Sequence, residues 1–177
     1  ADAGWDIDEI DCPPIRKPAE INATLWMADT VLGAEELIAR EADPDATFAF
    51  ETMLDLAGPL DQEAVMAALQ ARITLMRQWA MFFESYPLVI CPVSGERPFA
   101  QQSDVRSKAD FERIYEAQLT QRAIPVLGCP AMAVATGTID DQPMGVQLVS
   151  ARFREDILFS AGEVLEAAAP EVEVADP

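Results

Sequence analysis

A long stretch of helical periodicity constrains the fold of this chain more than any other feature. After Asp61, apolar residues recur at spacings of four and three residues, namely Val65, Leu69, Ile73, Met76, Ala80 and Phe83. This repeat is typical of a helix with one apolar face. Asp61 is a candidate N-cap, and Pro87 ends the pattern. The sequence therefore predicts an amphipathic helix of about six turns, whose apolar face we expect in the core rather than in a partner's groove.

Shorter patterns surround this helix. Apolar spacing predicts further helices over residues 18–32, 46–57, 110–122 and 157–168. Strands are predicted over residues 5–8, 88–91, 131–135 and 145–149. Residues 5–8 alternate apolar with polar, as an edge strand does, whereas 88–91 form an apolar run expected to be buried on both faces. A loop is expected over 94–107, and 136–143 form a hairpin-like connection. Helices interleaved with short buried strands predict an α/β layer architecture.

The composition excludes several functions. The chain has 177 residues, with 12 basic and 31 acidic side chains, no histidine and a net charge of −19. This charge argues against binding to nucleic acid or to an anionic membrane surface. No apolar run approaches the roughly 20 residues of a membrane helix. A GC-rich genome is the simpler origin of the acidity, and adaptation to salt is the alternative. The chain opens without an initiating methionine or a signal-peptide pattern, so we expect a segment of something longer.

Residue chemistry alone predicts no active site. Without histidine there is no Ser-His-Asp or Cys-His catalysis and no histidine metal site. The three cysteines are widely spaced, which argues against a zinc site or disulfides and favours a reduced, cytoplasmic compartment. Cys91 and Cys129 lie in apolar surroundings without a nearby cation, so both are expected to be core thiols. Ser107 and Lys108 are adjacent and would point about 100° apart on a helix, which disfavours proton transfer. Acidic pairs such as Glu155-Asp156 are expected on solvated faces. No metal or cofactor is expected.

The last third of the chain is more specific. Residues 126–137 read VLGCPAMAVATG and residues 142–149 read QPMGVQLV, followed by Phe153, Asp156 and a closing helix. This closely resembles the C-terminal part of the amidase signature family, with its G-x-P-A, L-P-x-G-x-Q-L and F-x-x-D elements. Residues 86–92 resemble the family's preceding buried strand, and residues 3–5 resemble the start of its edge strand. The resemblance covers residues 1–177, is sharpest over 128–166, and leaves an acidic tail over 170–177 that we expect to fray.

The resemblance implies part of a mixed-sheet α/β/α fold and an enzyme that cuts carboxamide C–N bonds. In the family a serine attacks the carbonyl, activated by a second serine in a cis peptide and by a lysine. These residues belong to the N-terminal half, and this chain has neither a Ser-Ser dipeptide nor a Gly-Ser-rich loop. The chain alone is therefore expected to be inactive. The stretch 118–125 corresponds to a pocket-lining segment, so Gln118 and Gln121 are candidate substrate contacts; the alternative is that both are helix-surface amides.

Three departures from the family pattern affect substrate identity. Pro125 stands where asparagine is usual, Ala135 where a proline is common, and Val93 where threonine follows the proline. The expected partners are a small-molecule amide and the N-terminal half of the same fold. A chain separated from that half exposes an apolar face and an open strand edge, so a homo-oligomer is also expected. The alternative function is a stand-alone, non-catalytic module that binds a small molecule or a partner protein.

Overall fold

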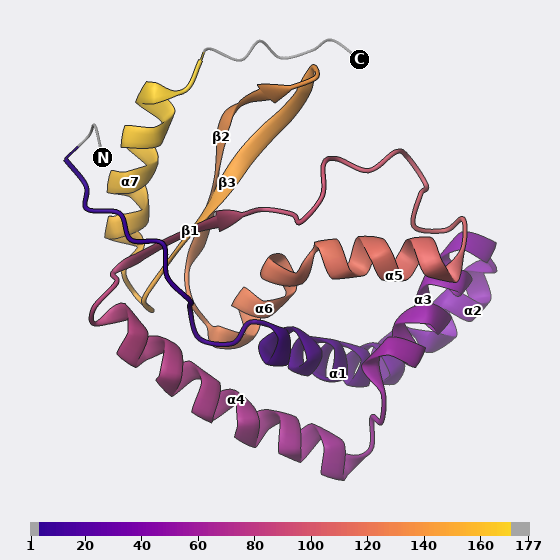
Figure 1. Cartoon of the computed structure of the whole chain (residues 1–177). Helices are drawn as coiled ribbons and strands as arrows, with labels where there is room; N and C mark the ends of the chain where they lie inside the picture. The colour runs from indigo at the N-terminus through magenta and orange to yellow at the C-terminus, as the bar shows by residue number, and fades with distance from the viewer. Residues whose placement is uncertain (1–3, 171–177) are drawn as a thin grey trace.

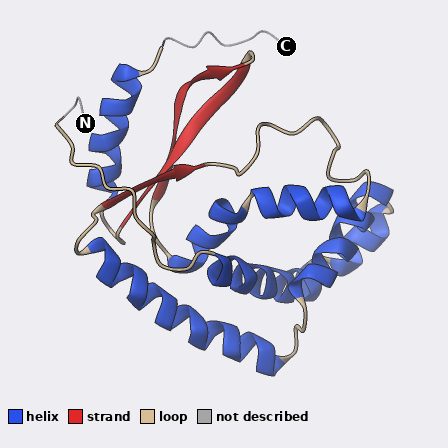
Figure 2. Ribbon diagram, in the orientation of Figure 1, coloured by secondary structure: helices blue, strands red, loops and turns tan. Residues whose placement is uncertain are grey.

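The computed structural model describes residues 4–170, which form seven helices and three strands (Figures 1 and 2). The helices are α1 (Arg16–Gly33), α2 (Glu35–Glu41), α3 (Pro44–Ala57), α4 (Gln62–Phe83), α5 (Lys108–Ala117), α6 (Leu119–Leu127) and α7 (Glu155–Ala168). The strands are β1 (Leu88–Pro92), β2 (Ala131–Ile139) and β3 (Gln142–Ser150). The α/β class predicted from the sequence is confirmed.

The three strands form one antiparallel sheet in the order β1-β3-β2. β2 and β3 are joined by a tight turn in which Asp140 and Asp141 have φ values of 50° and 62°. Two consecutive residues with positive φ match the twist of a two-residue hairpin. Both strands therefore extend further toward the turn than predicted. A register shift between Ala135 and Gly137 bends β2 near its middle.

Helices cover both faces of the sheet. On one face, α7 packs through Leu158 and Ala161 against Val134 and Leu148. On the other face, Val149 joins a cluster contributed by α1, α4 and α6. Figure 1 shows α7 on one side of the strands and these three helices on the other. The arrangement is the α/β/α layering expected from the sequence.

Two strand predictions need correction. Residues 5–8 are not a strand: within the described residues they pair with no strand, and Trp5 instead packs against the buried cluster that includes Leu148 and Leu158. Trp5 and Ile7 line a hollow between β1 and α7, a contact that needs no ladder hydrogen bonds. Ile7 is 67% exposed, so only part of the apolar side of the segment is covered. β1 itself is confirmed, but Ile90 is about half exposed, so the strand is not buried on both faces. Between residues 4 and 170, no strand pairs with the outer edge of β1, because β1 lies at the end of the sheet.

The long helix α4 begins and ends as predicted. The amide of Ala64 donates to Asp61 Oδ1 at 2.8 Å, which caps the helix. Its buried side is different from the predicted one, however. The buried residues are Ala68, Leu75, Trp79 and Phe83, whereas Phe83 alone of the predicted row is buried and Ile73 is 69% exposed. Both rows have helical spacing, and contact with α1 and α6 selects the row that is buried.

The other helices follow the predictions in part. α1, α3 and α7 are confirmed, with Gly33 at the end of α1 as expected. The helix α2 was not predicted from the sequence. The single helix predicted over 110–122 is two helices, α5 and α6, which change direction at Gln118. Most of the acidic tail, residues 171–177, lies outside the described residues.

Candidate functional site

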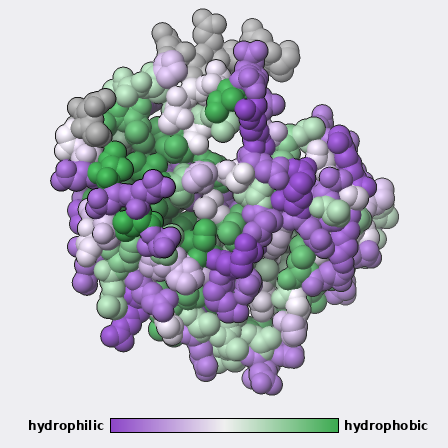
Figure 3. All heavy atoms as spheres, viewed as in Figure 1, coloured by the Kyte–Doolittle hydropathy of each residue, from purple (hydrophilic) through white to green (hydrophobic). Residues whose placement is uncertain are grey.

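A hollow of about 390 Å³ lies at the end of β1, between the loop that follows the strand and the β2–β3 hairpin. Its apolar wall includes Phe99, Val134 and Met144, and its polar side chains are those of Ser94, Glu96 and Arg97. Figure 3 shows polar and apolar spheres meeting beside the hairpin. A concave, mostly apolar surface with a few charged groups has the character of a small-molecule site.

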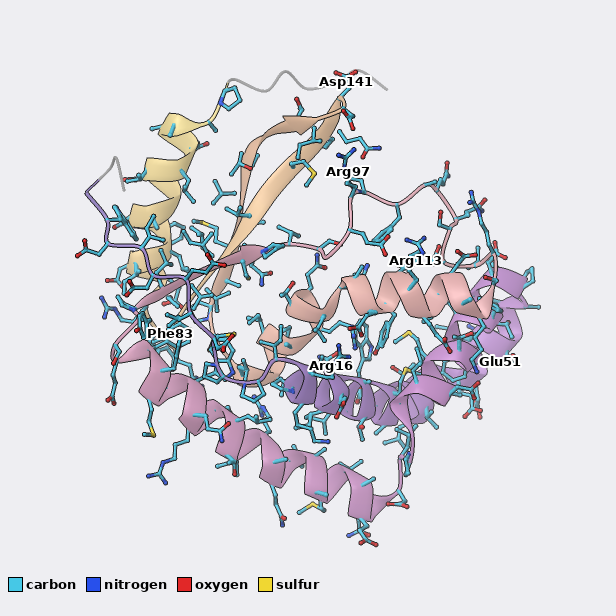
Figure 4. All side chains as sticks on the ribbon, in the orientation of Figure 1. Arg16, Glu51, Phe83, Arg97, Arg113 and Asp141 are labelled. Atoms are coloured by element: carbon cyan, nitrogen blue, oxygen red, sulfur yellow. The ribbon has the colours of Figure 1, made fainter. Side chains whose placement is uncertain are left out.

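Two ion pairs position the loop after β1 across this hollow. Arg97 pairs with Asp140 at the hairpin turn, and Arg113 of α5 pairs with Glu96. Figure 4 shows Arg97 directed toward the tip of the hairpin, near Asp141. All four paired side chains are at least 40% exposed, so each ion pair is expected to stabilise the fold by less than about 1 kcal/mol. The loop is thus positioned but not rigidly locked.

Hydrogen bonds tie the end of β1 to α6. Gln121 Nε2 donates to the Val93 carbonyl oxygen at 2.8 Å, and Thr120 Oγ1 donates to the Pro92 carbonyl oxygen at 3.0 Å. The Gly95 amide donates to the Ala117 carbonyl oxygen at 2.7 Å. A second hollow, of about 410 Å³, adjoins this junction and is lined partly by Leu119 and Thr120. Leu119 and Thr120 thus line this hollow and Pro125 lines another, while substrate binding by the segment 118–125 stays a prediction.

The two glutamines predicted from the sequence occupy different positions. Gln121 is exposed, and its side-chain amide binds the backbone of Val93, which lines the first hollow. Gln118 is half-buried at the junction of α5 and α6. The structure brings Gln121 to the end of β1 and leaves Gln118 farther along the helix junction. Substrate contact by either residue stays a prediction.

Sequence reasoning missed two residues of this region. Arg97 reaches a partner 43 positions away, and no local pattern marks that pairing. Thr120 lies inside the predicted stretch, between the two glutamines. No local pattern marks its role either, because the Pro92 and Val93 carbonyl oxygens that it binds lie 28 and 27 positions away.

The serine, the lysine and the two cysteines that the sequence predicts to be non-catalytic have structural roles. Ser107 caps α5 by accepting from the Asp110 amide at 3.1 Å. Lys108 Nζ instead binds Asp55 Oδ2 at 2.7 Å.

The thiols of Cys91 and Cys129 both pack against the main core cluster. Burial raises the pKa of Cys129 to about 11, which the nearby Arg152 only partly opposes. Burial likewise raises the pKa of Cys91, although Gln147 Nε2 donates to its sulfur at 3.6 Å. Neither thiol is activated as a nucleophile.

The raised pKa of Cys129 predicts slow alkylation in the folded chain. At pH 8, iodoacetamide should modify Cys129 about 100-fold more slowly than in urea, because the thiolate is the reactive form and each pKa unit changes its population about tenfold. The rate should keep rising about tenfold per pH unit beyond pH 9, measured by mass spectrometry of the Cys129 peptide. A rate that levels off near pH 9 in the folded chain would contradict the assignment.

Two further properties concern the whole described region. Between residues 4 and 170, no three or more Asp, Glu or Cys side chains are grouped where they would hold a metal ion. Within the same residues, no helix combines the length and apolar character needed to cross a membrane.

Comparison with solved structures identifies the fold. A structure of 6-aminohexanoate cyclic dimer hydrolase, complexed with substrate, superimposes with a TM-score of 0.67 and 23% identity, over 96% of this chain and 39% of that one. Allophanate hydrolase from Kluyveromyces lactis superimposes with a TM-score of 0.71 and 15% identity, over 95% of this chain and 27% of that one. The fold is therefore that of a portion of these larger hydrolases.

Comparison of sequences identifies the family. The sequence model of the amidase family matches residues 1–159, so the chain belongs to the amidase family. The indoleacetamide hydrolase of Bradyrhizobium japonicum is 30% identical over 165 residues, which are 93% of this chain and 36% of that protein. One component of the glutamyl-tRNA(Gln) amidotransferase of Pediococcus pentosaceus is 30% identical over 101 residues, 57% of this chain and 20% of that protein. The chain thus spans about a third or less of the length of these curated relatives.

Proposed function

We propose that this chain, over residues 1–177, is the C-terminal portion of an amidase that hydrolyses carboxamide C–N bonds. The observation that carries the proposal is the asymmetry of coverage, since 93% of this chain aligns with only 36% of an indoleacetamide hydrolase. The family motifs over residues 128–166 are those of a C-terminal portion. The catalytic serine, its cis-serine partner and the lysine then belong to the preceding part of the protein.

In this proposal the chain contributes binding surface rather than chemistry. Amide hydrolysis requires an activated nucleophile and hydrogen-bond donors for the oxyanion. The thiols of the chain have raised pKa values, and Ser107 is engaged as a helix cap. The hollow at the end of β1 is the part of the chain suited to the acyl side of a substrate. The proposed polar contacts are Gln121, which binds the Val93 backbone at the edge of this hollow, and Gln118, at the junction of α5 and α6. The preceding half of the fold is the proposed partner, in the cytoplasm.

The proposed substrate class is a small amide with an apolar acyl group. The walls of the hollow, formed in part by Phe99, Val134 and Met144, favour an aromatic or aliphatic group over a charged one. Indole-3-acetamide is a suitable first substrate, because relatives from two Bradyrhizobium species are named indoleacetamide hydrolases. Its hydrolysis adds water across the C–N bond and releases indole-3-acetate and ammonia.

The test compares the 177-residue chain with a protein extended by the coding region upstream of it. The chain alone is expected to release no ammonia from indole-3-acetamide above the uncatalysed rate. The extended protein is expected to exceed that rate by at least about 10⁶-fold, a typical enzymatic acceleration. Turnover by the purified chain alone would contradict the assignment of the catalytic residues to the preceding part. An upstream region that encodes no lysine and Gly-Ser-Ser-rich stretch would instead favour the stand-alone binding module.

A further inference from the structure

The apolar surface of α4 is wider than the core requires. Successive residues of a helix lie about 100° apart, so a second row of side chains runs roughly 100° around α4 from the buried one. We call this row the α4 seam; it consists of Met66, Leu69, Ile73, Met76 and Ala80. Most of these side chains are exposed, with Ile73 at 69%. An exposed row of this length on one helix marks an interaction surface.

Within the described residues, no helix or strand covers the α4 seam. The elements that pack on α4 are α1 and α6, which contact its buried row. Figure 1 shows α4 along the lower edge of the molecule, and Figure 3 shows pale green, apolar spheres mixed with purple, hydrophilic ones along the same rim. The seam residues are separated by three, four, three and four positions. This spacing is the one by which two helices pack side by side through their apolar rows.

Charge restricts what can cover the seam. The chain carries a net charge of −19, yet α4 contains only Glu63, Arg72 and Arg77 as charged residues and is therefore net +1. Two copies that meet along α4 avoid the repulsion between their acidic surfaces. The seam is thus a place where a second copy of this chain can approach closely.

The order of residues along α4 favours an antiparallel arrangement of the two copies. When two α4 helices run in opposite directions, Leu69 lies opposite Ile73 of the partner subunit, and Met66 lies opposite the partner's Met76. Glu63 and Arg77 are fourteen positions apart, and both lie on the same side of the seam around the helix. In the antiparallel pair, Glu63 of each copy therefore lies beside Arg77 of the partner subunit, which places opposite charges together twice.

We propose that the α4 seam binds a second copy of this chain in an antiparallel, two-fold symmetric dimer. Self-contact between identical patches is the commonest form of homodimer. The dimer is independent of amide hydrolysis and uses no residue of the hollow at the end of β1. Experiments can test separately which molecule covers the seam, in which direction its helix runs, and whether the proposed ion pairs form.

The first experiment introduces a charge into the seam. Sedimentation equilibrium of the 177-residue chain should show a dimer, and Ile73→Glu should raise its dissociation constant at least about 100-fold, because each copy would bury a carboxylate. Leu32→Glu is the matched control: Leu32 is 89% exposed at the end of α1, and its replacement should leave the dimer intact. Melting curves confirm that both variants are folded. A chain that stays monomeric up to about 100 µM, or association unaffected by Ile73→Glu, would overturn the proposal.

The second experiment identifies the occupant and its direction. Glu63→Arg and Arg77→Glu should each weaken the dimer by about tenfold, since each places like charges together twice. The double variant Glu63→Arg/Arg77→Glu should recover wild-type affinity, and a mixture of the two single variants should form heterodimers. No covering segment other than an antiparallel second copy gives this rescue. If the upstream-extended protein is a monomer and the charge exchange restores nothing, the seam belongs to the preceding part and the proposal fails.

Discussion

Replacement of Trp79 by alanine is expected to lower the free energy of unfolding by about 3–5 kcal/mol, the range for removing a large aromatic side chain from a core. The indole is 2% exposed and packs against the rings of Phe82 and Phe83, with centroid distances of 5.7 and 5.6 Å. Its Nε1 donates to the Pro14 carbonyl oxygen at 3.4 Å, which holds the segment before α1 against α4. Alanine removes the packing and the hydrogen bond together.

Trp26 supplies a matched control for this prediction. It is 58% exposed on α1, so Trp26→Ala removes the same side chain from the surface and should cost less than about 1 kcal/mol. Urea unfolding followed by far-UV circular dichroism measures both variants against the parent chain. Equal losses for the two tryptophans would mean that the buried row of α4 is not the centre of the core.

Features set by neighbouring residues were predictable from the sequence. Asp61 caps α4 with its own carboxylate, and Gly128 ends α6 with a positive φ of 65°, as the turn before β2 requires. In each case the determining contact lies within a few residues or within one recognisable motif.

Features set by distant contacts were not predictable. α4 has two apolar rows, and the choice between Trp79 and Ile73 as the buried side depends on α1 and α6, which lie far away in the sequence. The break between α5 and α6 at Gln118 has no proline or glycine to mark it. The same limit applies to the candidate site, because its hollow depends on the path of a loop that Arg97 fastens to Asp140 on the hairpin.

Gly145 lies at a position in the β2–β3 hairpin, beside the hollow, that leaves no room for a side chain. It pairs with Ala135 across the β2–β3 ladder and lines the hollow at the end of β1. A Cβ atom at this position would lie 2.6 Å from the Val134 carbonyl oxygen, closer than such atoms approach one another. That oxygen belongs to the backbone of the paired strand, so relief of the clash requires β2 and β3 to separate.

Gly145→Ala is therefore expected to lower the free energy of unfolding by about 1–3 kcal/mol, the usual cost of forcing an extra carbon into a packed site. Gly33→Ala is the matched control: a Cβ there meets nothing within 4 Å, so the change should be neutral or stabilising by up to about 1 kcal/mol. Gly162→Ala should fall between them, because its Cβ would meet the flexible end of Met132. Urea unfolding ranks the three variants. If Gly145→Ala is as stable as Gly33→Ala, the two strands are not held as closely as the ladder requires, and the wall of the hollow they form is not a fixed surface.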